Sequence, residues 1–435
     1  MNEAVAARLG NATRRLLHRD RFTRRLATLS GGTAAGQLVI VASSPLLTRL
    51  YTPAELGVFA VLSAYISILG PVVTLRLEAP ILLERDERAA IRATLLCVLA
   101  TVAVTLLLMA AGTGLGVLGL SPAHWSHLGG LVWLVPLGVL LYGLAQPFTH
   151  WSLRQGEVRI NSVTQVVQSV AQVGTQLALG VLGWGAAGLG LGYVLGLLPR
   201  CVWRSAATRR TFWARLRRAD LRAMPATARQ HCRYPIMATP SMLLRLGAQF
   251  LPPIIITALY GPAVGGMFGL GQRVLTAPVR MLGLATSQAF LAEAGALDRA
   301  GLRRLFTTTL ARFAILGLLW TVPLLLLAPQ LFALVFGRDW RMAGEIVQVM
   351  MPLHLARFVV VPVSQVLNVI GRHDLDLALA VAIVAAMAAG FGSAQLLALG
   401  PLAAVALYSG LGCIAFLATI AVAWHHMRRA VEIGR

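Results

Sequence analysis

Long apolar segments alternate with short polar joints along the whole chain. An apolar helix of about 20 residues is long enough to cross a bilayer core of about 30 Å. The pattern therefore predicts an all-α polytopic membrane protein with no soluble domain. Twelve membrane-spanning helices are expected, over residues 26–48, 54–77, 90–117, 130–153, 159–181, 184–203, 234–259, 263–291, 303–328, 342–370, 374–397 and 401–425.

Arginine is concentrated in every second joint. The chain has 38 arginines and no lysine, with a net charge of +22. One set of joints carries about thirty arginines and the other set only three, and basic residues stay on the cytoplasmic side of a membrane. We therefore expect both termini in the cytoplasm and a multi-pass protein of the bacterial inner membrane. Because the arginines lie in joints and not on one soluble face, a nucleic-acid partner is excluded.

A ten-residue pattern, LYxPAxxGxF, occurs twice, at residues 50–59 and 259–268. The copies are 209 residues apart and span an even number of helices, which predicts two parallel six-helix lobes related by an axis along the membrane normal. Two lobes around a cleft indicate an alternating-access transporter. The expected organisation is a basic N-terminal segment 1–25, a first lobe 26–203, a basic linker 204–233, a second lobe 234–425 and a tail 426–435.

Several arginines fall inside the predicted spans of the second lobe. A cation there costs at least a few kcal/mol unless it has a partner or a wet cavity. No carboxylate in these spans is placed to neutralise them, so we expect an anion from outside, and guanidinium suits phosphate or pyrophosphate. The alternative is that each arginine bonds helix carbonyls. The candidates are Arg245, Arg273, Arg280 and Arg357; Arg312 is near enough to the surface to snorkel.

Amide side chains form a stripe on one face of the span 159–181. Their spacing of three and four residues favours a cavity face whose amides bind sugar hydroxyls, although hydrogen bonding between helices is the alternative. The stripe comprises Asn161, Gln165, Gln168, Gln172 and Gln176, and weaker candidates are Gln37, Gln146, Gln249 and Gln272.

Three further charged residues lie near the ends of the early spans. Arg76 and Glu78 favour a local ion pair, with a gate as the alternative. Arg49, beside the opposite turn, is expected to snorkel or to cap a gate. No cofactor, metal site or disulfide is expected, because the four cysteines have no CxxC spacing, and no Walker-type loop is present.

Residues 44–90, SPLLTRLYTPAELGVFAVLSAYISILGPVVTLRLEAPILLERDERAA, resemble the N-terminal signature of O-antigen-type (Wzx-like) polysaccharide-export flippases of the multidrug/oligosaccharidyl-lipid/polysaccharide (MOP) superfamily. The resemblance implies a MATE-like fold with a cationic central cavity. It also implies flipping of an undecaprenyl-pyrophosphate-linked oligosaccharide to the periplasmic leaflet. The implied partners are that lipid-linked oligosaccharide, membrane lipid, and the polymerase and assembly proteins of the polysaccharide.

Three other functions compete with this interpretation. A MATE-type drug/cation antiporter of the same fold needs carboxylates in its cavity, whereas the embedded charge here is positive. A membrane glycan polymerase or ligase needs an acid/base pair beside an external loop, but His124 and His127 have no carboxylate nearby. A non-transporting scaffold would leave the embedded arginines without a role. We therefore expect a transporter and not an enzyme.

Overall fold

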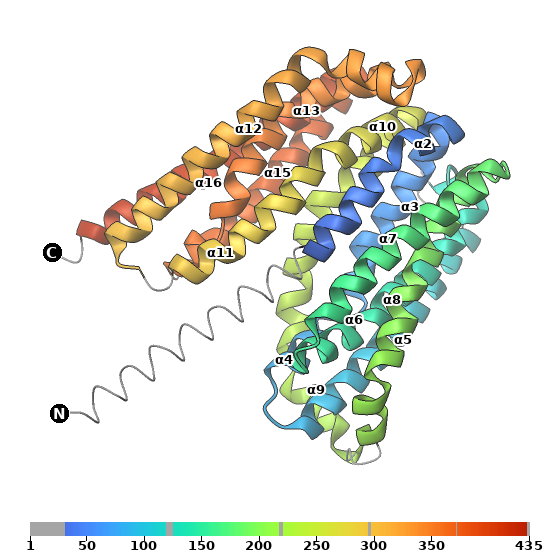
Figure 1. The fold of residues 1–435 in the computed structure, drawn as a ribbon, viewed down its shortest axis with the longest axis vertical. Coiled ribbons are helices and arrows are strands. Elements are labelled where there is room, and N and C mark those ends of the chain that lie inside the picture. Colours follow the sequence, from blue (N-terminus) through green and yellow to red (C-terminus); the bar gives the residue numbers. More distant parts are fainter. Residues whose placement is uncertain (1–30, 119–124, 217–220, 295–296, 371, 433–435) are drawn as a thin grey trace.

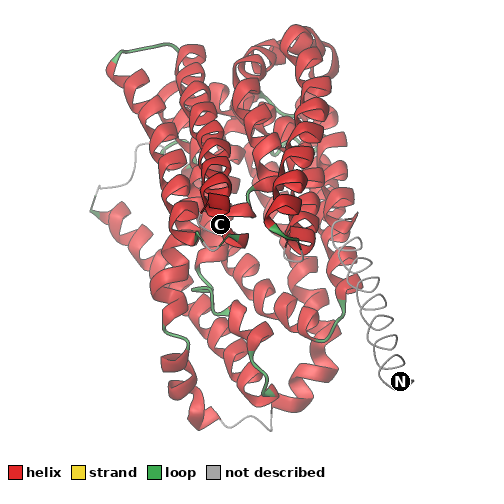
Figure 2. Cartoon of the chain, turned by 90° about the vertical axis from the view of Figure 1, so that its left-hand side faces the viewer, coloured by secondary structure: helices red, strands yellow, loops and turns green. Residues whose placement is uncertain are grey.

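The computed structural model describes residues 31–118, 125–216, 221–294, 297–370 and 372–432, and these residues form helices and no strands (Figure 2). Within them, nine helices are long and apolar enough to cross a membrane. The prediction of an all-α polytopic membrane protein is confirmed. The long helices are α3 (Pro53–Val72), α5 (Glu87–Val117), α6 (Leu134–Arg154), α7 (Val158–Val181), α8 (Gly185–Leu216), α10 (Thr239–Pro278), α12 (Arg299–Phe336), α13 (Arg341–Val360), α15 (His373–Leu396) and α16 (Pro401–Glu432).

Three features explain why nine apolar helices correspond to twelve expected spans. The span Tyr234–Gly283 is bent in its middle at Gly261, whose φ of 85° separates two helices. Helix α7 is long enough to span but carries the amide stripe, which lowers its hydropathy. The first helix covers residues 31–42 and continues into α2 (Ser44–Leu50), at the edge of the described residues.

The helices form two bundles (Figure 1). Helices α2 to α8 lie in the first bundle, α11 (Leu284–Ala294) to α16 lie in the second, and α10 packs on α3 as well as on α13 and α15. The bundles meet at the end where α2 terminates, here called the hairpin end. They separate toward the opposite end, called the arginine-rich end, where α4 (Glu78–Leu83) and α9 (Met224–Gln230) lie.

The two copies of the repeated pattern lie together at the hairpin end. A Cβ atom on Gly57 would overlap the carbonyl oxygen of Pro262, and a Cβ on Gly266 would overlap that of Pro53. The indole Nε1 of Trp340, in η6 (Arg338–Trp340), also donates a hydrogen bond of 3.3 Å to the carbonyl oxygen of Thr48. These contacts join the bundles at this end.

Three predicted spans are interrupted. The expected helix 54–77 ends at Val72, because Leu75 and Arg76 adopt φ values of 51° and 59° and turn the chain into α4. The expected helix 342–370 stops at Val360 and continues through η7 (Val361–Val363), where proline 362 removes a backbone donor, into α14 (Val366–Val369). The helix 263–291 contains a π-helical turn, η5 (Val279–Gly283), directly after Pro278.

Candidate substrate cavity

A cavity of about 190 Å³ lies between the first bundle and α10, bounded by the first helix, α3, α7, α8, α10 and η5. Its polar wall combines cationic, amide and hydroxyl groups. The residues that contribute polar side chains are Gln37, Ser63, Ser67, Gln172, Tyr193, Gln249, Gln272, Arg273, Thr276 and Arg280.

The two repeats line opposite walls of this cavity with equivalent positions. In each pair the residues are 209 positions apart, which is the offset of the repeated pattern. The repeats differ in charge, because only the copy on α10 brings a cation into the cavity. The pairs are Ala60 and Gly269, Ser63 and Gln272, Ala64 and Arg273, and Ser67 and Thr276. Phe59 also lines the cavity, whereas its equivalent, Phe268, does not belong to the described lining.

Arg273 and Arg280 give the cavity its charge. The guanidinium carbon of Arg273 lies 5.6 Å from the ring centroid of Phe59, which is a cation–π contact between α10 and α3. Arg280 is exposed and sits in the π-helical turn η5. No carboxylate occurs among the described residues of the lining. The cavity therefore favours an anion over a cation.

Arg357 extends this cationic region on α13. It is half-buried, lies outside the cavity lining, and is within electrostatic range of Arg280 and of the hydroxyl of Tyr408. His354, one turn earlier, is buried with its Nδ1 3.2 Å from the carbonyl oxygen of Met350. The structure brings three of the four arginine candidates, Arg273, Arg280 and Arg357, into one region.

Arg245 has a partner within the chain. Its Nη2 lies 2.6 Å from Oδ2 of Asp376, at the start of α15, and the Arg245 side chain remains 58% exposed. The expectation that no carboxylate neutralises the embedded arginines is therefore wrong for Arg245. The sequence gives no sign of this pair because its members are 131 residues apart. Arg312 is exposed on α12, as snorkelling requires.

The amide stripe of α7 divides between cavity and packing. Gln172 lines the cavity, whereas the amide of Gln176 donates a 3.0 Å bond to the carbonyl oxygen of Leu189 on α8. The side-chain oxygen of Asn161 accepts a 3.2 Å bond from Ser152. Gln165 packs against glycine 36 of the first helix, and Gln168 is absent from the lining described here.

Three glutamines ranked as weaker candidates also line the cavity. They are Gln37, Gln249 and Gln272, and Nε2 of Gln272 donates a 3.2 Å bond to the carbonyl oxygen of Gln249. Sequence neighbours could have predicted that Gln272 lines the cavity, because it adjoins Arg273 and lies 209 positions after Ser63. The amides of the lining therefore come from the first helix, α7 and α10.

The charged residues at the two ends behave differently. Nη1 of Arg76 lies 3.3 Å from Oε1 of Glu78, which confirms the predicted local ion pair. Arg49 is exposed in the last turn of α2, where a cation favours the helix dipole, and its role at a gate stays a prediction.

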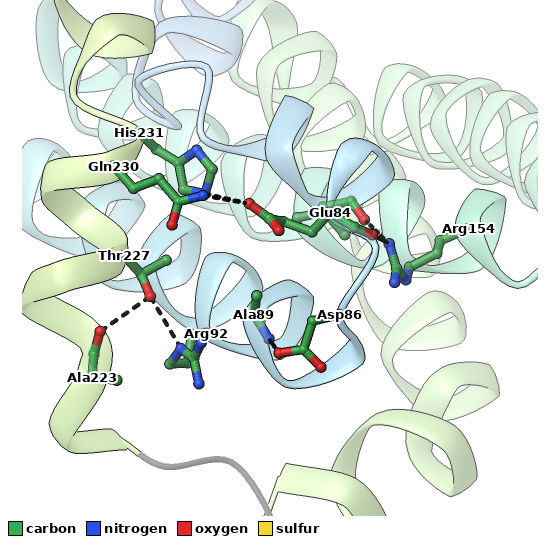
Figure 3. A network of polar contacts seen from close by, with 10 residues as sticks. Glu84, Asp86, Ala89, Arg92, Arg154, Ala223, Thr227, Gln230 and His231 are labelled. Carbon is green, nitrogen blue, oxygen red and sulfur yellow. Dashed lines mark hydrogen bonds and ion pairs between the residues drawn. The ribbon is translucent and has the colours of Figure 1, made fainter.

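At the arginine-rich end, α9 is fastened to the first bundle (Figure 3). Oε1 of Glu84 lies 3.0 Å from Nε2 of His231 and accepts a 3.2 Å bond from Gln230. Nε of Arg92 donates a 3.0 Å bond to Thr227 on α9. Helix α9, which precedes α10 in the chain, is therefore held against the first bundle.

Solved structures share this fold over nearly the whole chain. An inward-facing MATE-family multidrug transporter of the MOP superfamily aligns with a TM-score of 0.63 at 14% identity, covering 93% of this chain and 95% of that one. A MOP-superfamily transporter from Pyrococcus furiosus, described as having a binding pocket of reversed polarity, aligns at 0.61 and 14%, covering 93% and 96%. The lipid II flippase MurJ aligns at 0.73 and 10%, covering 91% and 87%.

These alignments show the fold, which is the polytopic all-α fold of solved membrane transporters described as members of the MOP superfamily. No curated protein matches the chain. The family model described as "Polysaccharide biosynthesis protein" matches residues 46–345, well over half of the chain. The chain belongs to this polysaccharide biosynthesis protein family.

Proposed function

We propose that the protein is a flippase that moves an undecaprenyl-pyrophosphate-linked oligosaccharide across the bacterial inner membrane by alternating access. The observation that carries this proposal is a cavity between two repeat-related walls that holds Arg273 and Arg280 and no carboxylate among its described lining residues. Guanidinium groups bind diphosphate oxygens through charge-assisted, bidentate hydrogen bonds. Family membership and the shared transporter fold support the same assignment.

The distribution of polar groups suggests how the substrate is held. The pyrophosphate contacts Arg273 and Arg280, with Arg357 adding positive potential behind them. Amides such as Gln172 and Gln272 contact the sugars, and the polyprenyl tail stays in lipid. The cavity of about 190 Å³ suits the charged head group alone. Pockets that enclose larger ligands reach about 300–1,000 Å³, so the bundles must separate further to admit the glycan.

The arrangement of the two bundles suggests which conformational state of the transport cycle the structure represents. With the arginine-rich end in the cytoplasm, as basic residues favour, the bundles are joined on the periplasmic side and separated on the cytoplasmic side. This is the inward-facing state in which a substrate is loaded. Rocking of the bundles about the contact between the two repeats then exposes the cavity to the other leaflet.

A binding experiment on the purified protein tests the proposal. Undecaprenyl diphosphate should bind the wild type, with inorganic pyrophosphate as competitor. R273A and R280A should each weaken binding roughly 10- to 100-fold, the value of a charge-assisted hydrogen bond of about 1.5–3 kcal/mol. R312A is the matched control, because Arg312 is an exposed arginine on α12 away from the cavity lining.

Two outcomes would contradict the proposal. Equal affinity of the wild type, R273A and R280A would remove the cavity arginines from the binding site. Binding of organic cations in preference to the diphosphate would favour a MATE-type drug antiporter of the same fold.

A further inference from the structure

An apolar groove lies between α5 and α6, in the part of the first bundle that points toward the hairpin end. It comprises two adjoining cavities, of about 900 Å³ and about 340 Å³, which share the side chains of Met109, Trp133 and Pro136. The larger cavity is also bounded by α3 and by η2 (Gly129–Trp133). No charged side chain occurs in the described lining of either cavity. The groove therefore suits an uncharged, apolar ligand.

Helices α5 and α6 touch near their middles and separate beyond that point. A Cβ atom on Gly143 of α6 would lie only 2.6 Å from Cγ2 of Thr101 on α5. The lining of the smaller cavity begins one residue later on α5, at Val102, and that of the larger one extends to Val117, at the end of the helix. Gly112 lines the larger cavity and leaves it open because it has no side chain. The groove therefore follows from the way these two helices pack.

Helix α3 closes the groove on its inner side, through Tyr65 and Leu69. Nε1 of Trp125 donates a 3.2 Å hydrogen bond to the hydroxyl of Tyr65, so the indole N–H needs no partner from a ligand. Tyr65 is two positions from both Ser63 and Ser67, which line the substrate cavity, and helical residues two apart do not share a face. The groove and the substrate cavity have no lining residue in common, and α3 lies between them.

The outer side of the groove is open to the surface that faces lipid. Leu106 and Leu137, which line the smaller cavity, are exposed, and so is Leu115 in the larger one. The stretch of α5 that lines the larger cavity, from Leu108 to Val117, is about 14 Å long at about 1.5 Å per residue. One leaflet contributes about 15 Å, half of a bilayer core of about 30 Å. A hydrocarbon chain of one leaflet therefore fits along the groove.

A phospholipid of the surrounding membrane suits this groove better than a transported lipid does. A lipid whose head group reaches Arg273 would have to pass its chain around α3 to enter the groove. A phospholipid chain enters directly from the bilayer, through the exposed outer side. Because the described lining has no charged side chain, the groove does not select the head group by its charge.

We propose that the groove between α5 and α6 is a binding site for one acyl chain of a membrane phospholipid, and that the chain supports α3 on the side opposite to the substrate cavity. The chain contacts α5, α6 and the α3 side chains Tyr65 and Leu69. Without it these side chains lose packing contacts on one side, which destabilises the first bundle. The affinity grows with each methylene group that is buried, and it is independent of the head-group charge.

A photoreactive phospholipid tests the site. The purified full-length protein is irradiated with phosphatidylethanolamine that carries a diazirine near the end of one acyl chain, and labelled peptides are measured by mass spectrometry. Label should be concentrated on residues 102–117 and 132–140, relative to α12, whose Leu319 is exposed to lipid.

A matched pair of variants on α5 separates the groove from the rest of the lipid-facing surface. G112L places a side chain in the groove and should lower the labelling about tenfold, the loss expected when about two methylene groups of the chain are displaced. G114L should be labelled like the wild type, because Gly114 lies outside the described lining and a Cβ there meets no atom within 4 Å. Leucine favours a helix more than glycine does, so both variants should fold.

Competition identifies the occupant. Unlabelled phosphatidylethanolamine and phosphatidylglycerol should displace the label equally well, and both should do so better than undecaprenyl diphosphate. Equal labelling of G112L and G114L would overturn the site. Preferential displacement by undecaprenyl diphosphate would show that the groove holds the polyprenyl tail and would overturn the phospholipid as occupant.

Thermal unfolding tests the support of α3. Phospholipid added to the delipidated protein in detergent should raise the unfolding temperature of the wild type and of G114L more than that of G112L. An equal rise in all three proteins would overturn the stabilising role of the chain. No transported substrate is needed for these measurements, so the flippase assignment stands or falls separately.

Discussion

Gly57 and Gly266 occupy equivalent positions in the two repeats, and each lies against the backbone of the other repeat. A side chain at Gly57 would overlap the carbonyl oxygen of Pro262, and one at Gly266 would overlap that of Pro53. Neither obstacle is a side chain that could rotate away. The join between the bundles at the hairpin end therefore depends on the absence of a Cβ atom at both positions.

Alanine at either glycine should push the bundles apart at the hairpin end. G57A and G266A are each expected to lower the unfolding free energy by about 1–3 kcal/mol, as overpacking does, and to reduce transport. Thermal unfolding in detergent measures the first effect. G174A is the matched control, because a Cβ at Gly174 on α7 meets no atom within 4 Å. Unfolding of G57A at the temperature of G174A would contradict the close contact.

Two tyrosines of the repeats fasten each copy to its own bundle. The hydroxyl of Tyr51 donates a 2.6 Å bond to the carbonyl oxygen of Gln176, and that of Tyr260 donates a 2.8 Å bond to Leu399. Y51F and Y260F should each destabilise the protein by about 1 kcal/mol, the value of one hydrogen bond. Because the bonds lie in different bundles, the double variant should lose the sum in denaturant unfolding. A double variant no less stable than either single one would show that the bonds are not independent.

The pair of Arg245 and Asp376 distinguishes a structural arginine from a substrate-binding one. With the Arg245 side chain 58% exposed, a double-mutant cycle should give a coupling of at most about 1 kcal/mol. The double variant R245A/D376A should retain polysaccharide export, because it removes equal and opposite charges. Loss of export as complete as in R273A would instead assign Arg245 to the substrate site.

Asp86 provides a pH-dependent cap at the start of α5. Its carboxylate accepts bonds from the backbone N–H groups of Arg88 and Ala89, and these bonds lower the pKa of Asp86 from its usual 3.8. A lowered pKa means that the stabilisation is present above the unfolded-state value and is lost as pH falls through the folded-state value. The wild type should therefore be more stable than D86A by about 1 kcal/mol at neutral pH. This advantage should fade below pH 3.8 in unfolding curves recorded against pH. A difference that persists under strong acid would contradict the role of the carboxylate.

Periodicity and charge were sufficient to predict the helical membrane fold and the repeat. Apolar length determines which segments can span, and the LYxPAxxGxF pattern marks the place where the two copies meet. The break after α3 could not be predicted, because Leu75 and Arg76 are not residues that favour a left-handed turn. Helix α4, which follows this break, packs against α5 and α6, and no local signal in the sequence marks the break.

The candidate site was predicted in part for a similar reason. Arginines and amides inside spans stand out from an apolar background, which is how Arg273, Arg280 and Gln172 were predicted, and all three line the cavity. Which side of a helix faces the cavity depends on partners far away in the chain. The sequence alone therefore does not show that Gln176 donates a hydrogen bond to Leu189 on α8, or that Arg245 forms an ion pair with Asp376.

The most direct test of the flippase assignment is the leaflet distribution of undecaprenyl-pyrophosphate glycans in cells that lack this gene. The deletion strain should accumulate them on the cytoplasmic face and lose surface polysaccharide. The wild-type gene and the R312A variant should restore the normal distribution, while a well-expressed R273A/R280A variant should not. Normal distribution in cells carrying only the R273A/R280A variant would contradict the account.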